Sequence, residues 1–392
     1  VSLDSALGRQ RRLNSVGESV LQIAPNAAAA YSLRSLTGGD PRVVRVRRDT
    51  DNAEQDFTAS GVSSGALVDF ATSGNGVFAN TGYESFTNAS ASGFTASNTG
   101  STGFAVSDIL DGVSGDAVSV SFDIDITNGS PGISLRTALN GGSTASNGIV
   151  YTTSGSKIAT LTGNKSYAGI GFTEGDAPSN FTVSNFKVLG NGFVETWYDQ
   201  SGNSNDAVQA TAGNQPKIVN SGSLVVSNGS PAVFFTGDTR DDELDFTDLT
   251  LTDAAIFTVV DIDSSADQQI LLGGSDSTTT GTMIAIMDNG SSTTEVYKNS
   301  TVGSQFKNGS AITLSNRDGA FDGLAVDEQI LFTMIDVDVA EAKVLDGISR
   351  CPSNARTFHL QGKMNELIIY NSDQAAKRPA IEANINSHYS IF

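Results

Sequence analysis

Carboxylates dominate the residues with which this chain could do chemistry. The 392 residues include 43 aspartates and glutamates, but two histidines, His359 and His388, and one cysteine, Cys351. Because the histidines stand in a strand-like segment and in a helix-like one, a Ser-His-Asp triad or a histidine metal site has little to build on. The single cysteine excludes an intrachain disulfide, and with no obvious base near it in the sequence we expect an inert thiol.

Glycoside hydrolysis would need two carboxylates about 5 to 9 Å apart. The candidates are Glu195, Asp199, Asp206 and Glu366. Asp199 opens the turn Asp-Gln-Ser-Gly-Asn, in which a carboxylate can cap backbone N–H groups. Glu366 precedes an apolar strand, where it can pair with an arginine. We favour these structural roles and expect no enzymatic activity, with a glycosidase as the alternative.

Further acids crowd one loop, and hard cations bind clustered oxygen ligands. They are Asp238, Asp241, Asp242, Glu243, Asp245 and Asp248. Their spacing does not match an EF-hand. A solvated acidic loop is the favoured interpretation; calcium at Asp238, Asp241, Asp242 and Asp245 is the alternative, and no other cofactor is expected.

Aromatic rings are the candidates for glycan contacts, because sandwich lectins often stack exposed rings on sugars. Tyr83, Tyr151 and Tyr167 lie in a part of the chain rich in Ser, Thr, Asn and Gly. We expect most phenylalanines to be core residues instead, since aromatic side chains dominate sandwich interiors.

The elements that must position these residues are mainly strands. From Val118 to Ile126, apolar residues alternate with Ser and Asp, which predicts a strand with one buried face. The nearly continuous apolar runs at 256–260 and 330–335 predict strands covered on both faces. The segment 181–188 changes phase, which suggests a bulge. One helix is convincing, at the C-terminus, where Ile381 and Ile385 share a face and Pro379 suits the first turn.

Charge divides the chain unevenly. The net charge is −20, yet the first 50 residues hold eight arginines and four acids, so they carry +4 and the rest −24. An acidic body excludes a general nucleic-acid-binding surface, which requires a basic face. Residues 1–24 contain Arg9, Arg11 and Arg12 and a faint heptad, and we expect a basic arm for anchoring or oligomerisation. Arginines paired inside the fold are the alternative.

Neither a membrane helix nor a signal peptide is expected. No apolar run reaches the roughly 18 residues that span a bilayer, and the first residues lack the apolar core of an export signal. We therefore expect no membrane partner, and the lack of an export signal agrees with assembly in a cytoplasm.

A repeated tripeptide suggests an insertion. Gly-Asn-Gly occurs at 74–76 and again at 190–192, each time followed by two apolar residues. The residues between, 77–190, suit one small β-sandwich. We predict that they are inserted into a host domain made of 25–76 and 191–392.

The host segments resemble phage structural proteins that carry a concanavalin-A-like, laminin-G-like sandwich. The resemblance lies in AYSLR at 30–34, VRVRR at 44–48, WYDQSGN at 197–203, QPKIV at 215–219 and the ending NELIIYNSDQAAKRPAIEANINSHY. The first half is also similar to the catalytic domain of fungal arabinofuranosidase B, and the insert to carbohydrate-binding jelly rolls.

This resemblance implies a concanavalin-A-like jelly-roll sandwich with an inserted second sandwich and a short C-terminal helix. It implies a non-enzymatic virion protein: a tail fibre, a spike or a capsid-surface appendage. Other virion proteins would be partners through the arm, host surface glycans would be ligands, and a homo-oligomer is expected. An arabinofuranosidase-type hydrolase and a bacterial adhesin or lectin are the alternatives.

Overall fold

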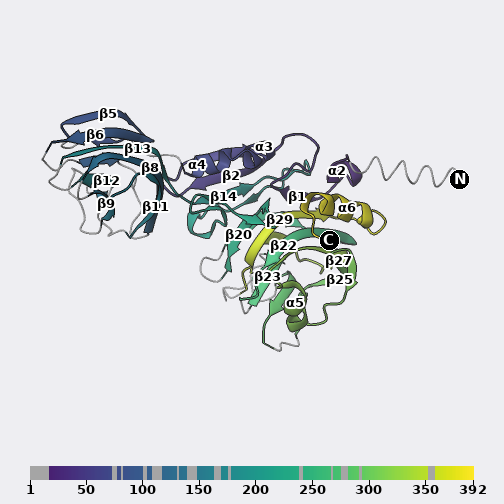
Figure 1. Cartoon of the computed structure of the whole chain (residues 1–392). Helices are drawn as coiled ribbons and strands as arrows, with labels where there is room; N and C mark the ends of the chain where they lie inside the picture. Colours follow the sequence, from purple (N-terminus) through teal and green to yellow (C-terminus); the bar gives the residue numbers. More distant parts are fainter. Residues whose placement is uncertain are drawn as a thin grey trace.

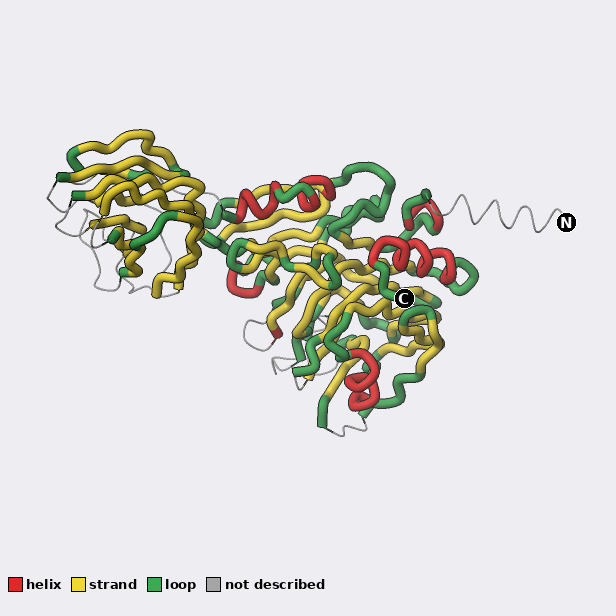
Figure 2. The backbone as a smooth tube through the Cα atoms, viewed as in Figure 1, coloured by secondary structure: helices red, strands yellow, loops and turns green. Residues whose placement is uncertain are grey.

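A computed structural model describes residues 17–392, apart from 73–76, 81–82, 100–103, 108–116, 130–131, 139–147, 163–168, 175–177, 238–241, 266–267, 275–280, 291–293 and 352–357. Across the described residues the chain is mainly β, and short helices lie at the outside of the sheets (Figure 1, Figure 2). The predicted mainly β, sandwich-type fold is confirmed.

Seventeen strands from both ends of the chain form one linked sheet system, which we call the host sandwich. They are β1 (Ala29–Ser32), β2 (Arg42–Arg48), β3 (Glu54–Thr58), β14 (Gly192–Trp197), β15 (Ala207–Val208), β16 (Lys217–Asn220), β17 (Ser223–Leu224), β20 (Val233–Thr236), β21 (Leu244–Leu249), β22 (Ala254–Ile262), β23 (Gln268–Gly273), β24 (Met283–Asp288), β25 (Ser300–Lys307), β26 (Ser310–Ile312), β27 (Gln329–Val339), β28 (Leu345–Ile348) and β29 (Gln361–Tyr370). A separate two-stranded ribbon joins β18 (Val226–Ser227) to β19 (Ser230–Pro231).

The pairings divide the host sandwich into two layers. One layer runs β1–β29–β22–β27–β25–β26, and the other runs β3–β2–β14–β15–β21–β28–β23–β24. Strands β16 and β20 pair with each other and join the layers. The largest apolar cluster contains Val44 and Trp197 of one layer and Ile256 and Val260 of the other. This cluster is the core between the layers.

The central strands are buried on both faces, as their continuous apolar sequences predicted. Ile256 of β22 faces the core between the layers, whereas its neighbour Phe257 belongs to a second cluster with Ile381 and Ile385. Both isoleucines lie on α6 (Arg378–Tyr389), the predicted C-terminal helix, which begins with a proline in its first turn. That helix therefore shields the outer face of the β22 layer.

Several short helices were not predicted. They are α2 (Val20–Ile23), α3 (Ala59–Ser63), α4 (Ala66–Ala71), α5 (Arg317–Leu324) and the 3-10 turn η1 (Ala212–Asn214). The four α-helices each bury only a few side chains, such as Val62 of α3 and Leu67 of α4, and η1 buries none. Helices this short show too little periodicity to be recognised from sequence. None of the helices in the described residues is long and apolar enough to cross a membrane.

Residues 79–188 form two separate five-stranded sheets, which we call the inserted sandwich. The strands are β4 (Ala79–Asn80), β5 (Ser85–Ser90), β6 (Gly93–Asn98), β7 (Phe104–Ser107), β8 (Ala117–Gly129), β9 (Ile133–Ala138), β10 (Ile149–Tyr151), β11 (Gly155–Thr162), β12 (Gly169–Glu174) and β13 (Ser179–Val188). Val120, Phe122 and Ile124 point into a core of their own, while Ser121 and Asp123 lie on the outer face. The pairing of β13 with β8 shifts register between Ser184 and Lys187, which confirms the predicted bulge.

The two host segments that flank the inserted sandwich contact each other. The Asp49 carboxylate accepts hydrogen bonds from the backbone N–H of Asn191 (2.9 Å) and from its side-chain amide (2.7 Å). A Cβ atom at Gly190 would lie 2.7 Å from the carbonyl oxygen of Ala71, so this position requires glycine. The chain therefore leaves and re-enters the host sandwich at one point.

The predicted arm, residues 1–24, extends into the fold at its end. Val20 and Ala24 are fully buried in the cluster that α6 covers. Arg9, Arg11 and Arg12 lie outside the described residues. An arm that is separable from the host sandwich must therefore end before Val20.

The two sandwiches have separate cores, so a cavity in one core should leave the other intact. Phe94 is 1% exposed and lies 4.9 Å from Phe78 between ring centroids. We expect Phe94→Ala to destabilise the inserted sandwich by about 3–5 kcal/mol. Circular dichroism during urea unfolding should show this loss, while fluorescence of Trp197, the single tryptophan, should report an unchanged host sandwich.

The matched control is Ile158→Ala, because Ile158 is 77% exposed on the same sandwich. This change should leave both transitions within about 0.5 kcal/mol of the parent chain. Equal shifts of the fluorescence and dichroism transitions by Phe94→Ala would show that the two sandwiches unfold as one unit.

Candidate functional site

Asp199 organises a turn. One of its carboxylate oxygens accepts from the backbone N–H groups of Ala30 (2.8 Å) and Ser201 (2.9 Å). The other accepts from the Ser201 hydroxyl (2.6 Å) and the Asn205 N–H (3.0 Å). Asp206 accepts in turn from the Asp199 N–H at 2.9 Å. The predicted capping role of Asp199 is confirmed, and the carboxylates of both Asp199 and Asp206 accept hydrogen bonds from backbone N–H groups.

Gln200, whose role the sequence did not reveal, connects this turn to the loop after β1. Its side-chain oxygen accepts from the Leu36 N–H at 2.8 Å, and its amide donates to the carbonyls of Ser32 (2.9 Å) and Arg34 (3.0 Å). Gln200 is 7% exposed, so these hydrogen bonds are largely shielded from water. They fix the backbone that carries Arg34.

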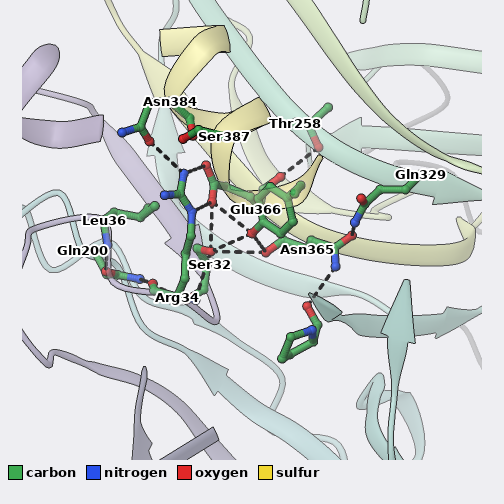
Figure 3. A network of polar contacts seen from close by, with 12 residues as sticks. Ser32, Arg34, Leu36, Gln200, Thr258, Gln329, Asn365, Glu366, Asn384 and Ser387 are labelled. Carbon is green, nitrogen blue, oxygen red and sulfur yellow. Dashed lines mark hydrogen bonds and ion pairs between the residues drawn. The ribbon is translucent and has the colours of Figure 1, made fainter. Parts of the chain in front are cut away.

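Arg34 forms a bidentate ion pair with the fully buried Glu366 (Figure 3). The Nε–Oε2 distance is 2.7 Å and the Nη2–Oε1 distance is 2.9 Å. Nη2 also donates to Asn384 of α6 at 3.2 Å. Burial alone would lower the pKa of Arg34, but the Glu366 carboxylate outweighs it and raises that pKa. The predicted pairing of Glu366 with an arginine is confirmed.

Two hydroxyl groups complete the environment of Glu366. Ser32 and Tyr389 each donate to its Oε2 atom at 3.1 Å. Burial, and then the carboxylate itself, raise the pKa of Tyr389 well above its ordinary value, so the phenol stays protonated. Both carboxylate oxygens of Glu366 therefore accept hydrogen bonds from other residues of the protein.

A cavity of about 420 Å³ lies beside this network. Its walls are the loop at Leu33–Ser35, the segment at Gly39 and Asp40, four residues of α3 (Ala59, Ser60, Val62 and Ser63), Pro231, and the end of α6 at His388 and Tyr389. Pro231 and Ala59 are partly exposed and contribute apolar surface, whereas Leu33 and Val62 are almost fully buried. Arg34, Asp40 and His388 contribute the charged and titratable groups.

The polar groups at the cavity differ in how they are satisfied. Asp40 accepts from the N–H (2.8 Å) and the hydroxyl (2.6 Å) of Ser60, and these hydrogen bonds lower the pKa of Asp40. Partial desolvation, followed by the charge of Arg34, lowers the pKa of His388, so the neutral form of its ring predominates at pH 7 although the residue is exposed. Among the described residues, none accepts a hydrogen bond from Nη1 of Arg34.

A second cavity, of about 430 Å³, is acidic. Asp261, Asp327 and Glu328 contribute to its lining. Asp261 pairs with Lys363 at 2.9 Å, and Asp327 accepts from the backbone N–H of Ser264 at 2.8 Å. The described residues contain no group of three or more His, Cys, Asp or Glu side chains able to hold a metal ion.

The four candidate catalytic carboxylates do not come together at either cavity. Asp199, Asp206 and Glu366 have the structural partners given above, and Glu195 accepts from the Thr196 hydroxyl at 2.5 Å. None of the four is among the residues that line these two cavities. Arg34 and His388 do line one of them; no local sequence pattern places them in a site, since His388 stands in a helix-like segment and Arg34 lies within the AYSLR motif.

The tyrosines predicted to bind glycans occupy different environments. The prediction for Tyr83 is wrong: its side chain is 5% exposed, donates to the Phe172 carbonyl at 3.2 Å and packs among aromatic rings. Tyr151 is half-buried against Phe122, with the Lys157 ammonium 5.8 Å from its ring centroid. Tyr167 lies outside the described residues.

The predicted calcium ligands are described only in part, since Asp238 and Asp241 lie outside the described residues. Asp242 is buried and accepts from the N–H (2.8 Å) and the hydroxyl (2.7 Å) of Thr236. Asp245 forms an ion pair with Arg350. These two aspartates thus have separate protein partners, and calcium binding stays a prediction.

Comparison with known proteins identifies no family. No family model matches the chain. No curated protein matches it either. Among solved structures, the tandem CBM22-1 and CBM22-2 domains of Paenibacillus barcinonensis Xyn10C are 11% identical, over 76% of this chain and 91% of that one, with a TM-score of 0.22.

Two further structures align as weakly. The M60 catalytic domain with the CBM51-1 and CBM51-2 domains of Clostridium perfringens ZmpB is 9% identical over 88% of this chain and 37% of that one (TM-score 0.19). An allantoicase structure is 10% identical over 76% and 90% (TM-score 0.18). TM-scores this low carry no argument about function.

Removal of Arg34 should reveal how strongly the buried pair constrains the host sandwich. Arg34→Ala leaves the Glu366 carboxylate buried without its cation, and we expect a loss of about 3–5 kcal/mol in the free energy of unfolding. Urea titration followed by Trp197 fluorescence measures it. Arg42→Ala is the control, because Arg42 pairs with Asp56 at the surface and its removal should cost about 1 kcal/mol.

A double variant separates charge from packing. Arg34→Met combined with Glu366→Gln removes both charges and keeps an acceptor for Ser32 and Tyr389, so it should recover about half of the loss. A double variant as unstable as Arg34→Ala would show that the pair acts by shape rather than by charge.

Tyr31 should make the host sandwich sensitive to alkali. Burial, and then the charges of Asp199 and Asp206, raise the pKa of Tyr31 well above its ordinary value of about 10. Above that pH the Tyr31 phenol loses its proton in the unfolded chain but keeps it in the folded chain. The free energy of unfolding is therefore unaffected by this group below about pH 10 and falls as the pH rises further. Tyr31→Phe should flatten this fall between about pH 9 and 11.5 in urea titrations at each pH.

Tyr151→Phe in the inserted sandwich is the control and should leave the alkaline profile of Trp197 fluorescence unchanged. Equal alkaline slopes for Tyr31→Phe and the parent chain would contradict the role given to the Tyr31 phenol.

Proposed function

We propose that this chain is a non-enzymatic structural protein of a phage particle. It is an appendage such as a tail fibre, a spike or a capsid-surface protein, assembled in the bacterial cytoplasm. The N-terminal arm attaches it to other virion proteins and to copies of itself, and the sandwiches face outward toward host glycans. The motifs of the host segments, from WYDQSGN to EANINSHY, support this assignment by resemblance.

The position of helix α2 relative to the inserted sandwich carries the proposal. Helix α2, where the described chain begins, packs on α6 through Val20 and Ile385, and the Asn384 amide donates to the Glu18 carbonyl at 2.7 Å. The inserted sandwich lies at the opposite end of the host sandwich (Figure 1). A chain attached through its arm would therefore hold the inserted sandwich away from the particle.

The charge distribution supports the same orientation. The body beyond residue 50 carries −24, which favours solubility and repulsion between neighbours at a crowded particle surface, whereas the first 50 residues carry +4. A basic segment suits an acidic docking site on another virion protein.

The occupied carboxylates support a non-enzymatic role. Glycosidase chemistry requires an acid able to exchange protons with substrate and a second carboxylate facing it. Glu366 is buried under four hydrogen bonds, and Asp199 accepts four from its own turn and β1.

Assembly through the arm is tested by the mass in solution. Multi-angle light scattering of the full chain should give a multiple of 40.6 kDa, and a chain lacking residues 1–16 should give 40.6 kDa less the mass of those residues. The deletion ends there because Val20 and Ala24 are part of the host core.

The control is Arg9, Arg11 and Arg12 changed together to Lys, which keeps the positive charge and should keep the oligomer. Monomeric mass for both the full and the shortened chain would contradict self-assembly through the arm. An unchanged oligomer after deletion would place the subunit contacts in the sandwiches instead.

A further inference from the structure

We propose that the cavity between α3, the loop after β1 and the end of α6 binds one neutral saccharide unit. The inference rests on the proposed function, because it identifies the place where that appendage would contact a glycan. It moves this contact from the inserted sandwich to the host sandwich.

The size and lining of the cavity suit a sugar. Ligand sites commonly have volumes of about 300–1,000 Å³, and the cavity of about 420 Å³ lies in this range with room for a pyranose ring. Pro231 and Ala59 are partly exposed and form an apolar side, against which the C–H face of a sugar ring can lie and lose contact with water.

The polar side offers both donors and acceptors, which hydroxyl groups need. Arg34 has an N–H group at Nη1 with no acceptor among the described residues, and it lines the cavity. Asp40 is an acceptor, since its carboxylate receives hydrogen bonds from Ser60 but donates none. The neutral ring of His388 supplies one donor and one acceptor, and no described residue hydrogen-bonds to it.

The charges around the cavity select for a neutral ligand. Glu366 offsets the charge of Arg34 at 2.7 Å, and His388 is uncharged at pH 7, so Asp40 leaves the site with one net negative charge. A carboxylate or phosphate ligand would meet this charge without a free cation to compensate for it. Hydroxyl groups carry no such cost.

The donor is held in place before any ligand arrives. Two hydrogen bonds from Arg34 to Glu366 and one to Asn384 fix the guanidinium plane, and Gln200 holds the Arg34 carbonyl (Figure 3). A donor with a fixed direction costs little conformational entropy on binding and distinguishes between sugar epimers.

A blocking substitution tests the site in the full chain. Ser63 and Ser64 are adjacent, exposed residues, each donating its hydroxyl to the carbonyl three residues before it, but Ser63 lines the cavity and Ser64 is not among its lining residues. Ser63→Trp should fill the cavity mouth, and Ser64→Trp is the matched control. The probes are glucose, galactose, mannose, N-acetylglucosamine and lactose, with glucuronate and N-acetylneuraminate as anionic sugars.

Saturation-transfer-difference NMR titrations should find at least one neutral sugar that binds with a dissociation constant of about 1 mM. Ser63→Trp should weaken that binding at least about tenfold, Ser64→Trp less than about twofold, and the anionic sugars should bind more weakly than the neutral one. His388→Ala should weaken binding about threefold to tenfold without changing the urea midpoint.

The possible outcomes separate this inference from the proposed function. If a sugar binds equally to the Ser63→Trp and Ser64→Trp chains, the cavity is not the site, although the glycan-binding role stands. If an anionic sugar binds more tightly than every neutral one, the charge argument is overturned. If none of these sugars binds the parent chain while light scattering still shows assembly through the arm, the cavity inference and the glycan contact both fail and the structural role remains.

Discussion

The buried ion pair between Arg34 and Glu366 is the interaction on which the host sandwich depends. A charged carboxylate removed from water costs several kcal/mol unless hydrogen bonds and an opposite charge replace its hydration. Here the guanidinium, Ser32 and Tyr389 replace it together. Ser32 ends β1, Arg34 lies in the loop that follows, Tyr389 belongs to α6 and Glu366 itself belongs to β29, so the pair joins elements that are distant in sequence.

Several features meet at this pair. The Asp199 turn and Gln200 hold the loop that carries Arg34, and Asn384 links the guanidinium to α6 and, through its amide, to the start of α2. The Nη1 group of the same arginine is the fixed hydrogen-bond donor of the proposed saccharide cavity. Stability and recognition would therefore share one residue, which is why a substitution at the cavity mouth is a cleaner probe than one at Arg34.

The sequence predicted what depends on local pattern. Alternation at 118–126 placed Phe122 and Ile124 in a core, and the unbroken apolar run at 256–260 correctly indicated a strand covered on both faces. The short helices α3 and α4 were missed, because α3 consists largely of Ser, Gly and Ala and α4 is only six residues long, so neither shows a recognisable period. Tyr83 was misplaced for a different reason: a tyrosine in a polar stretch looks exposed until the sheet pairing brings Phe181 and Phe172 around it. The cavity joins residues 33–63, 231 and 388–389, and no local signal relates segments so far apart.

The pairing of β1 with β29 has a consequence for synthesis on the ribosome. Ala29 lies opposite Ile369, so the host sandwich cannot close until nearly the whole chain has emerged. The strands of the inserted sandwich pair only with each other in the described structure, and all of them lie between residues 79 and 188. The inserted sandwich can therefore fold first, bring Arg48 beside Gly192 and shorten the loop that β2 and β14 must close. In this order the inserted sandwich, although it forms a core of its own, promotes the closure of the host sandwich by folding early.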